Sequence, residues 1–115
     1  MKAKRNVNLK GCSFELGYAA AILEGIYRDA GAELVVTSAK DGTHGPRSLH
    51  PKGDALDGRT RQLTRAQGNR ILATAKAELE PLGFDVIDER AKPTAPHFHI
   101  EFQPKAGESF VTIEE

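Results

Sequence analysis

The segment "HFHIEF" (residues 97–102) constrains the fold most, because polar and apolar residues alternate in it without exception. On a β-strand such alternation places the apolar side chains on one face and the polar side chains on the other. The apolar set would enter a core: Phe98, Ile100 and Phe102. The polar set would stay available to a ligand: His97, His99 and Glu101. The segment therefore predicts a sheet with one covered face and one open face.

Residues 13–31 have the periodicity of a helix that could cover such a sheet. Ser13 can cap its first turn, and Gly31 follows the last turn, where a left-handed residue commonly ends a helix. Its large apolar residues recur at helical spacing: Phe14, Tyr18, Ile22, Leu23, Ile26 and Tyr27.

Residues 64–83 predict a second helix. Thr64 and Gln67 fit a capping box, and Gly83 ends the segment. The expected buried stripe consists of Ile71, Leu72, Ala75 and Leu79.

The remaining periodic segments are short and favour strands. They are residues 33–39, the stretch around Asp57, residues 84–89, residues 97–103 and, as a further candidate, residues 109–114. The order of elements predicts an α+β fold, with helices packed on one face of a mostly antiparallel sheet. A length of 115 residues suits one domain spanning residues 1–115.

The charge balance argues against nucleic acid as a partner. Sixteen basic residues offset sixteen acidic ones, so the net charge is zero. Only the start, "MKAKRNVNLK", is locally basic, and we expect a solvated or fraying terminus there.

Cys12 is the single cysteine, which excludes an internal disulfide and a thiolate zinc cluster; a buried thiol is expected. No apolar run is long enough to span a bilayer, and no secretory signal follows the basic start. The sequence predicts a protein that is cytoplasmic as synthesised and has no membrane partner.

The segment "SLHPKGDALD" (residues 48–57) carries a histidine and an aspartate seven positions apart. A straight strand would separate the two Cα atoms by about 23 Å, too far to share a metal. Pro51 and Gly53 allow a reversal between His50 and Asp57. Taken singly, these residues are more often surface or turn residues. Together with His99 they predict a zinc site of His50, Asp57 and His99 with one open position, as a catalytic site requires.

These residues resemble a known family. Ser-x-His-x-x-Gly-x-Ala-x-Asp followed by His-x-His is similar to LAS-type zinc metallopeptidases, which include D-alanyl-D-alanine carboxypeptidases, L-alanyl-D-glutamate endolysins and the hedgehog signalling domain. The resemblance spans residues 35–103. It implies helices on an antiparallel sheet and zinc bound by His50, Asp57 and His99. It further implies that His97 stabilises the oxyanion and that Ser48 supports the loop carrying His50.

The chain departs from this pattern at the general base and at the substrate arginine. Pro96 stands three positions before His99, where the family often has a carboxylate, so Glu89 at the end of the preceding strand is the candidate base. A plain exposed strand-end residue is the alternative reading of Glu89. "TSAKD" replaces the arginine-bearing stretch that grips the substrate carboxylate. The candidate substitutes and cleft residues are Lys40, His44 and Arg47.

The resemblance predicts a zinc-dependent peptidase that acts on bacterial cell-wall peptide, with peptidoglycan as the partner. It would be a carboxypeptidase or a phage-type endolysin, released on host lysis or associated with a virion. A zinc-containing binding or structural module without turnover is the alternative, and incidental histidines are a third reading.

Overall fold

A computed structural model describes residues 1–3, 7, 13–39 and 55–103. Within these residues the sheet has five strands in the order β1-β2-β3-β5-β4. Their bounds are Lys2–Ala3 for β1, Val35–Ser38 for β2, Ala55–Arg59 for β3, Phe84–Glu89 for β4 and His97–Phe102 for β5. Only β1 and β2 pair in parallel, so the predicted α+β class with a mostly antiparallel sheet is confirmed.

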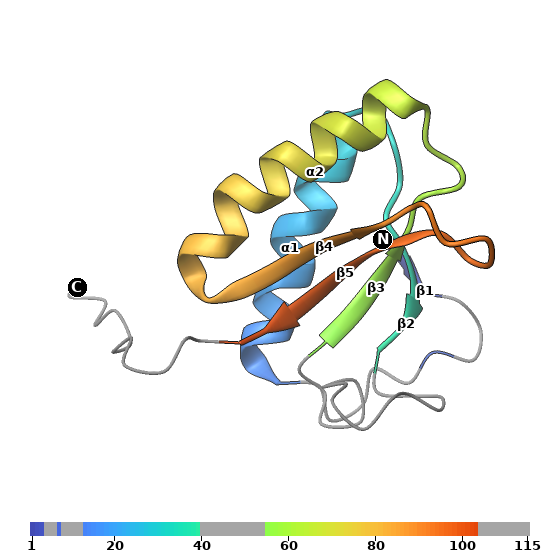
Figure 1. Cartoon of the computed structure of the whole chain (residues 1–115). Helices are drawn as coiled ribbons and strands as arrows, with labels where there is room; N and C mark the ends of the chain where they lie inside the picture. The colour runs from blue at the N-terminus through green and yellow to red at the C-terminus, as the bar shows by residue number, and fades with distance from the viewer. Residues whose placement is uncertain (4–6, 8–12, 40–54, 104–115) are drawn as a thin grey trace.

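In Figure 1 helix α1 (Phe14–Asp29) crosses behind β4 and β5, and helix α2 (Arg65–Leu79) runs alongside β4. A short 3-10 helix, η2 (Glu80–Leu82), leads from α2 into β4. One cluster of buried side chains joins both helices to the sheet. In the described part of the chain both helices pack on the side of the sheet that carries this cluster, and we call the opposite face of β3, β5 and β4 the open face because no described helix lies over it.

Helix α1 begins and ends where the sequence predicts. The Ser13 hydroxyl accepts a hydrogen bond from the backbone N–H of Leu16, and Gly31 has a φ of 80°. The prediction of the apolar stripe was wrong at two residues, since Phe14 and Tyr18 are 86% and 55% exposed. The buried face instead includes Leu16 and Ala19, together with three residues of the predicted stripe: Leu23, Ile26 and Tyr27.

Helix α2 has the predicted capping box. The Gln67 backbone N–H donates to the Thr64 hydroxyl, and the Thr64 N–H donates to the Gln67 side chain. Gly83, with a φ of 94°, ends the following turn. Ile71, Ala75 and Leu79 are buried as predicted, whereas Leu72 is only half-buried.

Lys2 and Ala3 form a strand of the sheet, so of the two predicted states of the terminus, solvated or fraying, fraying is wrong for them, while both residues are exposed. Lys2 and Ala3 pair with Val35 and Val36, and the Lys2 N–H donates to the Leu34 carbonyl at 2.8 Å. Backbone pairing holds this strand although its side chains remain exposed. Cys12 and the strand predicted over residues 109–114 lie outside the described residues.

Strand β3 packs tightly against α1 at Gly58. A Cβ atom there would lie 3.0 Å from Leu34 Cδ1 and 3.2 Å from the Tyr27 hydroxyl oxygen. The Tyr27 hydroxyl donates to the Arg59 carbonyl at 3.0 Å. Gly58 therefore faces the helices, and its neighbours Asp57 and Arg59 face the open side of the sheet.

Candidate metal centre

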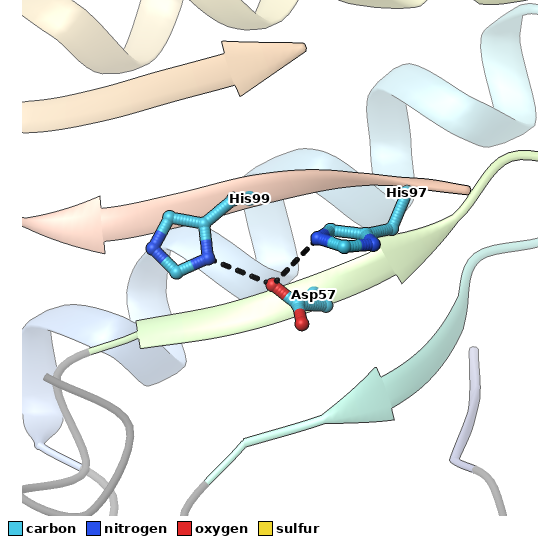
Figure 2. Close-up of side chains that lie close together, drawn as sticks. All are labelled: Asp57, His97 and His99. Atoms are coloured by element: carbon cyan, nitrogen blue, oxygen red, sulfur yellow. Dashed lines mark hydrogen bonds and ion pairs between the residues drawn. The ribbon is translucent and has the colours of Figure 1, made fainter. Parts of the chain in front are cut away.

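Strands β3 and β5 bring the polar residues of two distant segments together. Their antiparallel register places Asp57 opposite His99 and Arg59 opposite His97. The Asp57 Oδ1 atom lies 2.8 Å from His99 Nδ1 and 3.6 Å from His97 Nε2. Figure 2 shows the carboxylate between the two rings, on the open face of the sheet. The strand alternation predicted from the sequence thus produces a real cluster.

Asp57, His97 and His99 have the spacing of metal ligands. One ligand atom from each residue can be chosen so that all three lie within 4.8 Å of one another. One oxygen and two nitrogens suit zinc, which takes such ligands at about 2.0–2.2 Å, and they suit several other divalent ions as well. The group can therefore hold a metal ion after a small inward adjustment.

The loop before β5 orients the ring of His97. Ala95 has a φ of 49°, which is uncommon for a residue with a side chain. Its carbonyl lies 2.7 Å from His97 Nδ1. A carbonyl can only accept a hydrogen bond, so Nδ1 carries the hydrogen and Nε2 faces the cluster.

Two carboxylates flank the ring of His99. Asp57 faces Nδ1 at 2.8 Å and Glu101 faces Nε2 at 3.0 Å, and the His99 and Glu101 side chains are each 13% exposed. Burial by itself lowers the pKa of His99, but the hydrogen bonds with Asp57 and Glu101 outweigh it and raise the pKa to about 9. Without a metal, the His99 ring therefore carries hydrogens on both nitrogens and is positively charged at neutral pH.

Two neutral histidine rings cannot supply hydrogens for all the acceptors that surround them. All four ring nitrogens face acceptors, namely the Ala95 carbonyl and the carboxylates of Glu89, Asp57 and Glu101. Two neutral imidazoles supply only two hydrogens for these four contacts. The other two contacts need extra protons or a cation. A divalent ion among Asp57, His97 and His99 would satisfy this need.

Glu89 lies beside the cluster because β4 and β5 form a hairpin. Glu89 pairs with His97 across the strands, so the intervening loop does not separate them, and Glu89 Oε1 lies 3.0 Å from His97 Nε2. Its other oxygen lies 2.8 Å from Lys92 Nζ. Burial alone raises the pKa of Glu89, but the hydrogen bonds from Lys92 and His97 outweigh it and bring the pKa below its usual value. Glu89 is thus an ionised carboxylate at the site rather than a solvated strand end.

The structure brings together four of the predicted site residues: Asp57, Glu89, His97 and His99. His97, expected beside the metal as an oxyanion donor, falls within the group of possible ligands. The other predicted residues lie outside the described part of the chain: Lys40, His44, Arg47, Ser48 and the proposed ligand His50.

Two residues of the open face received no role from the sequence. Glu101 contacts His99, and the alternation "HFHIEF" was the signal that could have assigned it. Arg59 is half-buried opposite His97, and its Nε donates to Gln62 Oε1 at 3.1 Å. Gln62 in turn donates to the Glu33 carbonyl. Arg59 has no carboxylate partner within the described residues, so its charge is available to an anionic ligand.

Comparison with known proteins found no match for this chain among protein-family models, curated proteins or solved structures. The described helices include none with the length and apolar character needed to cross a membrane. The fold and the site together define an α+β domain with a histidine–carboxylate group capable of holding a metal.

Proposed function

We propose that this protein is a zinc-dependent peptidase acting on bacterial cell-wall peptide. The observation that carries the proposal is the convergence of Asp57, His97 and His99 beside the ionised Glu89 on the sheet face opposite the helices. The similarity of "SLHPKGDALD" and "HFH" to LAS-type zinc metallopeptidases supports it. Whether the enzyme is a carboxypeptidase or an endolysin-like endopeptidase is a question for the substrate assay.

In this proposal Asp57 and His99 bind the ion, and His50 supplies the third ligand. Zinc held there would lower the pKa of a bound water toward 7 and polarise the scissile carbonyl. Glu89 accepts the proton of the attacking water and returns it to the leaving amine, since its carboxylate is ionised. His97 Nε2 lies between Glu89 and Asp57, and when the ring carries hydrogens on both nitrogens its Nε2–H can donate to the developing oxyanion.

The identity of the third ligand is open to direct measurement. His97 Nε2 lies within ligand distance of the other two residues, and it competes with His50 for this role. Zinc affinity of His50→Ala and His97→Ala would separate them. We expect the larger loss for His50→Ala and a loss of turnover with zinc retained for His97→Ala. The reverse order of affinities would move His97 into the ligand set and leave the oxyanion without this donor.

Arg59 is the described residue best placed for substrate recognition in this scheme. Its guanidinium offers the paired N–H groups that fit a carboxylate, and Gln62 holds it in place without neutralising it. The predicted contacts of Lys40, His44, Arg47 and Ser48 with substrate remain predictions.

The decisive experiment is digestion of purified peptidoglycan and short muropeptides, with and without a chelator. We expect new amine ends that disappear on chelation and return with zinc. Glu89→Gln should bind zinc but cleave at least 100-fold more slowly, an order of magnitude expected for loss of a general base. Asp85→Asn is the matched control, because Asp85 lies on the same face of β4 and pairs with Glu101 rather than His97.

A binding module that holds zinc without turnover is the second candidate. The ion pair of Glu89 with Lys92 at 2.8 Å favours it, because a base already paired with a cation is weaker. Zinc binding with no new amine ends under any metal condition would support this alternative. A Lys92→Gln variant that gains cleavage would instead show that the ion pair restrains a working enzyme.

A further inference from the structure

We infer that Glu101 is a positioning residue, whose carboxylate fixes His99 so that Nδ1 rather than Nε2 faces the metal. This inference rests on the metal-binding part of the proposed function and is independent of peptidase activity.

The contact between Glu101 and His99 is close and sheltered. Glu101 Oε1 lies 3.0 Å from His99 Nε2, and both side chains are 13% exposed. The two residues are two positions apart on β5, so they share the open face of the sheet. A contact with little water around it orients a ring more strongly than an exposed one.

The chemistry of the two partners assigns the hydrogen. An ionised carboxylate only accepts hydrogen bonds, so Nε2 must carry a hydrogen for the contact to be favourable. Nδ1 then has the lone pair in the metal-bound protein, and it faces Asp57 at 2.8 Å. Metal-binding histidines commonly donate their other N–H to a carboxylate, which fixes the tautomer and raises the basicity of the ligand.

His97 shows the same principle with the opposite nitrogen. The Ala95 carbonyl holds Nδ1 at 2.7 Å, which leaves Nε2 directed at the cluster. His97 Nε2 and His99 Nδ1 are the two nitrogens that approach Asp57 Oδ1. The outer partners, Ala95 and Glu101, therefore account together for why these rings converge on one point from neighbouring positions of a strand.

Asp85 provides a matched control for the charge of Glu101. It lies directly opposite Glu101 in the register of β4 and β5, on the same face of the sheet. The Asp85 side chain makes no hydrogen bond or ion pair with the described residues, and it is half-exposed. If Glu101 acted only through its negative charge, removing Asp85 or Glu101 would lower zinc affinity by similar amounts. If Glu101 orients His99, only its removal should lower the affinity.

The test compares zinc affinity of the full chain, measured by competition with a chromogenic chelator, for the wild type, Glu101→Leu, Glu101→Gln and Asp85→Leu. We expect Glu101→Leu to lose roughly 10–100-fold in affinity, as outer-shell partners of metal ligands do. Glu101→Gln should recover part of the loss, because its amide oxygen can still accept from Nε2. Asp85→Leu should remain within about 3-fold of the wild type, the effect expected of a half-exposed charge that contacts neither histidine.

A second measurement, long-range ¹H–¹⁵N NMR of the zinc-loaded wild type, reads the His99 tautomer without any variant. Hydrogen on Nε2 and metal on Nδ1 is expected; the opposite assignment overturns the inference even where Glu101→Leu fails to fold. Equal zinc affinity of Glu101→Leu and the wild type also overturns it. Wild-type protein that binds no zinc refutes this inference and the proposed function together. Zinc binding that depends on Glu101, without peptide cleavage, refutes only the peptidase.

Discussion

The two faces of strand β5 differ in the interactions that hold their side chains, apolar packing on one face and polar pairing on the other. Phe98 and Ile100 are fully buried against the helices, while His97 and His99 lie on the open face among three carboxylates. The first set is held by the removal of apolar surface from water, which requires no particular partner. The two histidines are held by hydrogen bonds of about 3 Å, and one missing hydrogen there would leave a buried polar atom unpaired and cost free energy. The comparison teaches that burial sets the register and that the register then assembles the site.

The largest expected effect is on the helix-covered face. Phe98→Ala should lower the free energy of unfolding by about 3–5 kcal/mol, because the side chain is 0% exposed and leaves a cavity. Urea denaturation followed by circular dichroism measures it. A loss below about 1 kcal/mol would mean that the two faces do not differ as described.

The open face should respond to pH in a way that the covered face cannot. The pKa of His99 is raised to about 9 in the metal-free fold, against about 6.5 when unfolded. The stabilisation is complete below pH 6.5 and is lost as pH rises through 9. Metal-free protein should therefore lose about 3 kcal/mol of stability over this range.

Denaturation of chelator-treated protein between pH 6 and 9.5 measures this loss, and His99→Gln should abolish that part of the slope. Zinc affinity should change in the opposite direction and increase with pH, because the ion must displace the proton. A slope unchanged in His99→Gln would refute the assignment to this ring.

A smaller effect is expected at the border of the cluster. Arg59→Gln should raise KM for a substrate with a free carboxylate about 10-fold, the loss of one charged hydrogen bond, while kcat and zinc affinity change little. Steady-state kinetics on the acid and its amide measure this. Arg59→Lys should restore only part of the preference, and an unchanged KM in both variants would exclude Arg59 from recognition.

The smallest effect should come from Ile87, an exposed apolar residue of the open face. Ile87 is 44% exposed and lies opposite His99 in the register. Ile87→Ala should cost no more than about 1 kcal/mol, since little of its surface is removed from water. The same urea experiment used for Phe98→Ala measures the contrast, and a comparable loss in both variants would remove the distinction between the faces.

The sequence predicted those features that depend on local pattern. The alternation of residues 97–102 gave the correct face for each side chain, and Thr64 with Gln67 gave the start of α2. Asp57 lies beside His99 as predicted, whereas the bend predicted between His50 and Asp57 lies outside the described residues and stays a prediction.

Features that depend on tertiary geometry could not be predicted. The parallel pairing of Lys2 and Ala3 rests on backbone hydrogen bonds, which leave no trace in side-chain pattern. The exposure of Phe14 and Tyr18 depends on which side of α1 meets the sheet, and adjacent stripes look alike in sequence. The Glu101 contact depends on rotamers that alternation does not specify.

The separation of Asp57 and His99 along the chain has a consequence for unfolding. The two residues are 42 positions apart, and helix α2 lies between them. An ion bound by both residues would cross-link this stretch reversibly. By lowering the entropy of the unfolded chain it would stabilise the fold by an amount approaching that of a covalent link, about 4 kcal/mol. Amide exchange in α2 would then slow when zinc is added, although the helix touches no part of the ion.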